Sequence, residues 1–121
     1  MALGGACGAV ARYGVSSLAG RAGEGWPWGT LAVNLMGCLA VGAVLALMLT
    51  PEPSPRWPAS PAVRAAVLVG FLGAFTTFST YAWEAVDLLA NGKPGRAALY
   101  LLLSNAAGLA AVWAGWKVFD R

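Results

Sequence analysis

The sequence has no histidine, two cysteines and few charged side chains. Of its 121 residues, eight are Lys or Arg and five are Asp or Glu, whereas 59% are hydrophobic. A soluble domain of this size buries only about two thirds of its unfolded surface, so this composition would leave large apolar areas in water. Without histidine the chain also lacks the usual proton carrier near neutral pH and the commonest metal ligand. These absences argue against a soluble enzyme.

Other protein classes are excluded on similar grounds. Cys7 and Cys38 do not form a Cys-x-x-Cys pair and have no histidine to complete a zinc site, so we expect them to be packing residues. The net charge of +3 is not concentrated in a basic cluster, which argues against nucleic acid as a partner. Because Arg12 interrupts the N-terminal apolar stretch and no basic residue precedes it, we expect no cleaved signal peptide.

Long stretches without charge predict membrane-spanning helices. Such stretches comprise 27 residues between Glu24 and Glu52, 19 between Arg64 and Glu84, and 20 between Arg96 and Lys117. A helix of about 20 apolar residues crosses the hydrocarbon core of a bilayer. The N-terminal stretch is also apolar, although it contains Arg12, and we expect a fourth span there. The predicted fold is an all-α membrane protein with a single domain (1–121) of four transmembrane helices, at about 1–19, 28–49, 62–90 and 96–118.

The connections between these helices are short, and their basic residues divide almost evenly. Five prolines within 50–61 predict an extended connection between the second and third helices. The positive-inside rule compares Lys and Arg on the two sides of the membrane. One side carries Arg56, Arg64, Lys117 and Arg121, and the other carries Arg21, Lys93 and Arg96. Four against three is nearly no bias, so insertion in both orientations, and with it an antiparallel two-fold dimer, is possible.

The third helix contains an unusual run, GFLGAFTTFSTY, from Gly70 to Tyr81. Glycine, serine and β-branched threonine all weaken a helix, which favours a break in the middle of this span. Unwound backbone at that depth is tolerated where protein or a water-filled cavity satisfies the freed groups. The alternative is an uninterrupted helix whose hydroxyls bond the preceding turn.

Few other polar side chains occur within the predicted spans, and each is costly in hydrocarbon unless it has a partner or faces a cavity. Thr30 and Asn34 share one face of the second helix, and Tyr100 and Ser104 share one face of the fourth. Small residues recur at four-residue spacing, as at Gly4 and Gly8, and indicate close helix contacts within the chain or between subunits.

Three segments together resemble the Fluc (CrcB-like) family of fluoride channels: GGACGAVARY at 4–13, GTLAVNLMGC at 29–38, and GFLGAFTTFSTY at 70–81. The resemblance implies passive export of fluoride and hence fluoride resistance in a prokaryotic cell, across the inner membrane. It also implies an antiparallel, dual-topology homodimer with two pores and one structural sodium ion on the two-fold axis.

The resemblance further implies roles for individual residues. Backbone carbonyls of Gly73 and Thr76 from both chains would hold the sodium ion. Arg12 would lie in a vestibule. Tyr81 stands where the family typically has phenylalanine, so its hydroxyl is a departure from the pattern. The implied fluoride pore residues are Asn34, Phe78, Tyr81, Thr30, Ser79, Tyr100 and Ser104.

The residue types suit the task, because fluoride is small and strongly hydrated and a pore must replace its water with donors. Amide and hydroxyl groups do this without a permanent charge, and aromatic rings offer a positive edge. Two alternatives remain open. A small multidrug-type transporter would need a carboxylate within the spans, whereas Glu84 and Asp87 are expected to be surface or loop partners. A non-conducting membrane scaffold would use its polar groups only to join helices.

Overall fold

The computed structural model describes residues 1–23, 25–49 and 57–120, and the regular secondary structure of these residues is helical, with no strand. The all-α prediction is therefore confirmed for this part of the chain. In chain order the helices are α1 (Ala2–Gly20), α2 (Trp28–Leu49), α3 (Pro61–Arg64), η1 (Ala65–Leu72), α4 (Gly73–Phe75), α5 (Phe78–Ala90) and α6 (Pro94–Phe119).

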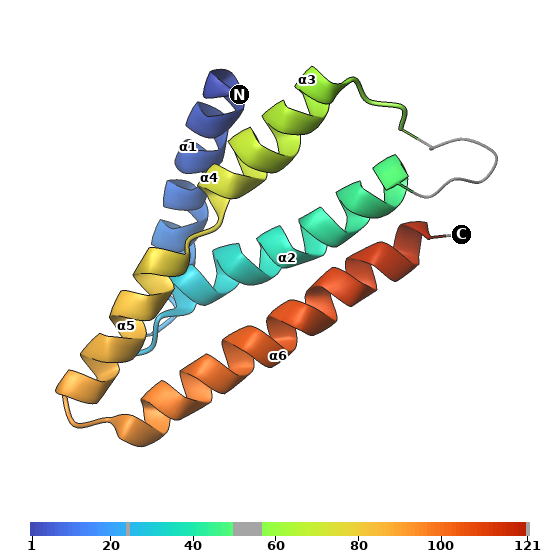
Figure 1. The fold of residues 1–121 in the computed structure, drawn as a ribbon. Coiled ribbons are helices and arrows are strands. Elements are labelled where there is room, and N and C mark those ends of the chain that lie inside the picture. The colour runs from blue at the N-terminus through green and yellow to red at the C-terminus, as the bar shows by residue number, and fades with distance from the viewer. Residues whose placement is uncertain (24, 50–56, 121) are drawn as a thin grey trace.

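Two long helices, α2 and α6, form the most extensive contact in the molecule and lie side by side, running in the same direction (Figure 1). The N-terminal helix α1 packs against η1 and α4, and α5 leads away to a turn that returns the chain into α6. The end of α2 and the C-terminus lie at one end of the α2–α6 pair, and the α5–α6 turn lies at the other (Figure 1).

Glycine permits the close approach of α2 and α6. A Cβ atom added to Gly42 would collide with the carbonyl oxygen of Val112, and one added to Gly115 would collide with that of Leu39. Small residues allow helix backbones to touch in this way when apolar surroundings provide no hydrophobic drive for association. The two glycines therefore fix the separation of the helices that form one side of the site described below.

The spaced glycines of α1 serve the same purpose within the chain. Gly4 and Gly8 lie against the carbonyl oxygens of Ala66 and Phe71, where a Cβ atom would not fit. The sequence left open whether these residues mark contacts inside the chain or between subunits. For Gly4 and Gly8 the structure shows the first.

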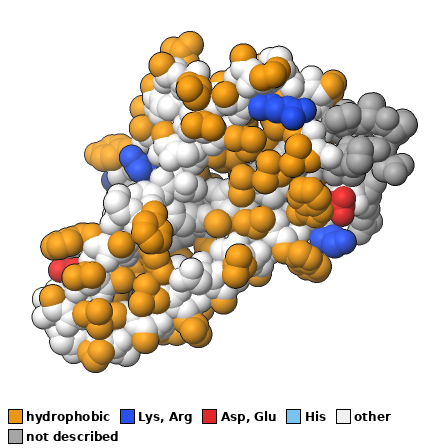
Figure 2. Space-filling view, viewed as in Figure 1, with side chains coloured by type: hydrophobic (Ala, Val, Ile, Leu, Met, Phe, Trp, Pro, Cys, Tyr) orange, Lys and Arg blue, Asp and Glu red, His pale blue; other side chains and the backbone are white. Residues whose placement is uncertain are grey.

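Three helical segments of the described chain are long and apolar enough to cross a membrane: Trp28–Leu49, Pro61–Ala90 and Pro94–Phe119. The molecule also shows hydrophobic side chains over much of its visible face, with few charged atoms among them (Figure 2). These features define a multi-pass membrane protein. The fourth span, at 1–19, stays a prediction because α1 is not among the three segments.

Part of the predicted connection between α2 and α3 lies outside the described residues, as do Arg56 and Arg121 from the charge comparison. The described part of the connection is not helical until Pro61, where α3 begins. The Ser60 hydroxyl caps this helix by accepting a hydrogen bond from the Val63 amide at 3.4 Å.

Replacing Gly42 with valine is expected to destabilise the protein, because the new side chain would force α2 away from α6. Overpacking of this kind costs about 1–3 kcal/mol or more. Thermal unfolding in detergent, followed by circular dichroism, measures the loss. Gly14→Ala is the control, since nothing lies within 4 Å of a Cβ atom at that position. Equal melting temperatures for Gly42→Val and Gly14→Ala would contradict the close packing.

Candidate functional site

The span that follows Pro61 is interrupted at Thr76 and Thr77. Helix α4 ends at Phe75 and α5 starts at Phe78, and between them both threonines have extended backbone conformations, with ψ angles of 161° and 117°. The interruption lies inside the run where the sequence favoured a break. Its depth in a membrane stays a prediction.

The side chain of Asn34, on α2, holds the interrupted backbone. Its amide nitrogen donates to the Thr77 carbonyl at 3.0 Å, and its oxygen accepts from the Thr77 N–H at 2.9 Å. Both backbone groups of a residue that is only 9% exposed are thus satisfied. One asparagine replaces the hydrogen bonds that a helix would have given Thr77.

The break also frees two carbonyl groups. In an uninterrupted helix the N–H of residue i + 4 would bond the carbonyls of Gly73 and Thr76. The Thr77 N–H bonds Asn34 instead, and the Thr80 N–H bonds the Thr77 hydroxyl at 3.4 Å. Carbonyl oxygens released in this way can bind a hard cation, which prefers oxygen ligands.

Local features of the chain position the break. The π-helical segment η1 precedes it, separated from it by the short α4, and the Gly73 N–H bonds the carbonyl of Leu68, five residues back. The hydroxyl of Thr76 donates a hydrogen bond to the Leu72 carbonyl at 3.1 Å. A hydroxyl bond to the preceding turn, as expected for an uninterrupted helix, therefore forms here although the helix is broken. Gly37 on α2 leaves room for the Thr76 methyl group.

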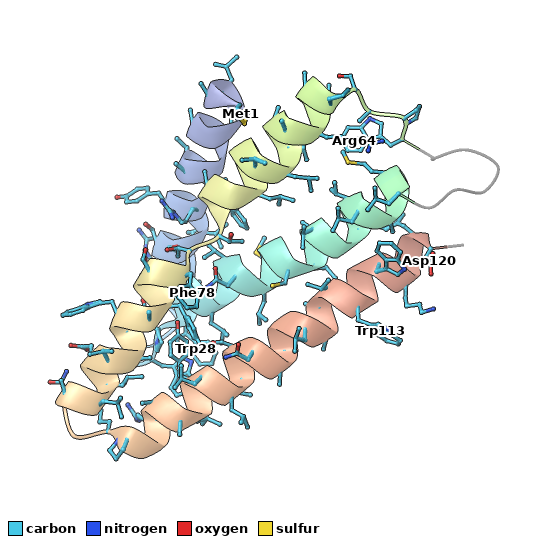
Figure 3. All side chains as sticks on the ribbon, in the orientation of Figure 1. Met1, Trp28, Arg64, Phe78, Trp113 and Asp120 are labelled. Carbon is cyan, nitrogen blue, oxygen red and sulfur yellow. The ribbon has the colours of Figure 1, made fainter. Side chains whose placement is uncertain are left out.

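A groove of about 400 Å³ opens beside the break, between α2, η1, α4, α5 and α6. Phe78, at the start of α5, lies at its edge (Figure 3) and is 78% exposed. Predicted site residues that line the groove are Asn34, Gly73, Thr76, Phe78, Tyr81 and Ser104.

A second cavity, of about 540 Å³, lies on the other side of Thr77, where α1, the start of α2 and α5 meet. Arg12 and Thr30 line this cavity together with Thr80 and Glu84. Because Thr77 lines both spaces, the broken backbone forms the boundary between them.

Glu84 is a site residue that the sequence analysis did not predict. Its two carboxylate oxygens accept hydrogen bonds from the hydroxyls of Thr30 and Tyr100, each at 2.7 Å. The expectation that Glu84 is a surface or loop partner is therefore wrong, because the carboxylate joins α2, α5 and α6. Asp87 is exposed, as expected. Glu84 follows Tyr81 by three residues, so the two lie on one face of the helix. This spacing could have predicted that Glu84 points inward.

The remaining predicted residues differ in their surroundings. Tyr100 is fully buried and reaches the second cavity only through Glu84. Tyr81 is 9% exposed, and its ring lies between those of Phe78 and Tyr100. Ser79 is exposed and lines neither space. The structure thus brings most of the predicted residues to the two sides of the break, but not Ser79.

The fold and the site define a class: a helical multi-pass membrane protein in which a broken helix lies between two spaces, each lined by both polar and apolar side chains. Hydroxyl and amide groups line these spaces, and the nearby cation and carboxylate belong to Arg12 and Glu84. An interrupted helix beside such spaces is typical of proteins that move ions.

Comparison with known proteins identifies the family. The family described as "CrcB-like protein, Camphor Resistance (CrcB)" matches residues 1–116, so the chain belongs to it. This is a family of ion channels and not of enzymes. The chain is 42% identical to a protein of Acidobacterium capsulatum, over all of this chain and 94% of the relative. It is 45% identical to one of Paracoccus denitrificans, over 98% of this chain and 90% of the relative. Both relatives are named "Fluoride-specific ion channel FluC".

Replacing Asn34 with leucine, of similar size, is expected to lower the stability of the protein. Each of the two Thr77 backbone groups left without a partner costs about 1–3 kcal/mol. Thermal unfolding in detergent measures this loss. Asn91→Leu is the matched control, because Asn91 is exposed at the end of α5 and its side chain bonds only the Asp87 carbonyl. Comparable losses for the two variants would show that Asn34 does not support the break.

Proposed function

We propose that this protein is a fluoride channel that lets the anion leave the cell passively. The observation that carries the proposal is the pair of spaces on either side of Thr77, in which hydroxyl and amide groups and Arg12 lie among apolar side chains. The names of the relatives supply the identity of the ion. Because hydrogen fluoride crosses membranes and ionises inside the cell, a passive exit for the anion confers fluoride resistance. We place the protein in the inner membrane of a prokaryotic cell.

We further propose that two chains form an antiparallel, dual-topology homodimer with two pores. One chain leaves its groove open, with Phe78 exposed at the edge and Gly73 exposed within it. A second copy against this face would turn each groove into an enclosed path. The nearly equal numbers of basic residues on the two sides of the membrane support opposite orientations for the two chains.

A structural sodium ion fits the residues present. Each chain contributes two carbonyl oxygens, from Gly73 and Thr76, whose helical partners are used elsewhere. Two oxygens are too few for a hard cation, whereas two chains would supply four. The sodium ion is therefore proposed to join the subunits at the breaks, while the anion follows the side-chain donors of Asn34 and Ser104.

The inward position of Glu84 removes one argument against a proton-coupled transporter, since a carboxylate does lie within the second candidate span. Its two oxygens are both bonded to hydroxyls, however, and it faces the cavity that also contains Arg12. We propose that it has a structural role and joins Thr30, at the wall of this cavity, to the buried Tyr100. A pH gradient that drives uptake against a fluoride gradient would favour the transporter instead.

Purified protein in liposomes is expected to release fluoride rapidly and chloride hardly at all. A fluoride-selective electrode and a chloride electrode measure the two rates on the same vesicle preparation. Equal release of both ions would exclude a selective channel, and no release of either would leave the scaffold as the better account.

Phe78→Ile is expected to reduce fluoride release at least tenfold while the protein still assembles, because an aliphatic side chain lacks the positive ring edge. The fluoride electrode and size-exclusion chromatography measure the two properties. Phe119→Ile, at the end of α6 and outside the groove, is the matched control. Normal release from Phe78→Ile vesicles would remove Phe78 from the path.

Exchange of sodium for potassium during purification and assay is expected to lower both the melting temperature and the fluoride rate. Returning sodium should restore both, because the four carbonyl oxygens would again share a cation. Identical melting temperatures and rates in the two salts would contradict a structural sodium ion, without affecting the identity of the permeant anion.

A further inference from the structure

Tyr81 carries a hydroxyl group at the wall of the groove. Its ring centroid lies 5.7 Å from that of Phe78 and 5.3 Å from that of Tyr100, and the residue is 9% exposed. A ring packed on two sides has little freedom to turn its hydroxyl elsewhere. The position of this hydroxyl is therefore set by the packing of α5 against α6.

Asn105 on α6 determines how the Tyr81 hydroxyl is used. Its amide nitrogen lies 2.7 Å from the Leu101 carbonyl and 2.8 Å from the Tyr81 hydroxyl oxygen. A carbonyl only accepts, so the nitrogen and not the oxygen of the amide must face Leu101. The same nitrogen donates its second proton to Tyr81, because an amide nitrogen does not accept. The Tyr81 oxygen is thus an acceptor in this pair and retains its own proton.

The hydroxyl proton of Tyr81 has no acceptor among the residues that the structure describes. The neighbouring groove residue Ser104 is in a similar position: its hydroxyl oxygen is buried and, within the described chain, has no hydrogen-bond partner. Buried hydroxyls normally find partners, and each unsatisfied one costs free energy. Two such hydroxyls on residues that line one groove therefore indicate an acceptor that binds there.

We propose that the Tyr81 hydroxyl donates a hydrogen bond to fluoride in the groove, and that Asn105 is the positioning residue that makes it a donor. This inference rests on the proposed channel function. An anion that accepts strongly and carries a full charge satisfies both Tyr81 and Ser104, and hydrogen bonds to charged acceptors are stronger than neutral ones. Since fluoride gains more from a short hydroxyl bond than the larger chloride does, Tyr81 also contributes to selectivity.

Fluoride and chloride release from liposomes test the role of Tyr81. Tyr81→Phe keeps the ring and removes the hydroxyl, and we expect the fluoride rate to fall roughly tenfold, as for loss of one bond to a charged group. The ratio of fluoride to chloride rates should fall with it. Trp113→Phe is the control, because Trp113 on α6 is 65% exposed and lines neither space, and its substitution should leave both rates unchanged.

A double-mutant cycle tests whether Asn105 acts through Tyr81. Asn105→Leu alone should lower the fluoride rate several-fold, and the double variant Tyr81→Phe, Asn105→Leu should equal Tyr81→Phe alone. If Asn105 had only a structural role, the fold-losses of fluoride rate in the two single variants would multiply in the double variant. Multiplied losses would therefore overturn the positioning role.

Asn105→Asp provides a second test that leaves the Tyr81 ring in place, and so does not depend on the folding of Tyr81→Phe. A carboxylate of the same shape accepts a hydrogen bond from the Tyr81 hydroxyl, so that this proton is no longer available to the anion and fluoride release should fall at least tenfold. Asn91→Asp controls for the added charge at an exposed site.

The outcomes separate the two proposals. Failure of the wild-type protein to release fluoride would overturn the channel function and this inference with it. Selective release by the wild type, with unchanged rates for Tyr81→Phe or Asn105→Asp, would overturn the donor role of Tyr81 and leave the channel function intact.

Discussion

The pair of hydrogen bonds between the Asn34 side chain and the backbone of Thr77 is the interaction on which the site depends. A backbone amide and carbonyl cannot be left unpaired inside a membrane protein, so a helix breaks only where something replaces its bonds. Asn34 replaces both at one residue. As a consequence, Thr77 lies between two spaces that contain polar groups, and the carbonyls of Gly73 and Thr76 lose their usual partners.

The packing of the helices around the break keeps the Asn34 side chain next to the backbone of Thr77. Glycine at position 37 allows α2 to approach Thr76, and glycines at 42 and 115 hold α2 against α6. The carboxylate of Glu84 adds a polar connection between α2, α5 and α6 through Thr30 and Tyr100. Close backbone contact and a few buried hydrogen bonds thus do what a large hydrophobic core does in a soluble domain.

Simple regularities of the sequence predicted the helical class, the three apolar segments and the region of the break. Charge spacing gave the segments, because a span must exclude charge over about 20 residues. The Gly-Thr-Ser composition of 70–81 gave the break, because each of these residues weakens a helix. Both signals are local in the sequence, so they needed no knowledge of which helices touch.

The partners of the polar side chains depend on tertiary packing and could not be predicted in the same way. Glu84 was assigned to the surface because it lies near the end of its span, yet helix packing brings Thr30 and Tyr100 to its two oxygens. The bond between Asn105 and Tyr81 likewise joins residues 24 positions apart on different helices. Ser79, chosen from its place in the motif, points away from both spaces because neighbouring positions of α5 take the inner face.

Solid-state NMR of the protein in lipid bilayers, with labelled threonine, asparagine and glycine, tests the central claim most directly. The account predicts non-helical backbone shifts at Thr76 and Thr77 and a coupling across the hydrogen bond between the Thr77 amide nitrogen and the Asn34 side-chain carbonyl carbon. Helical shifts through residue 77, with the Thr77 amide coupled to the Gly73 carbonyl, would contradict it.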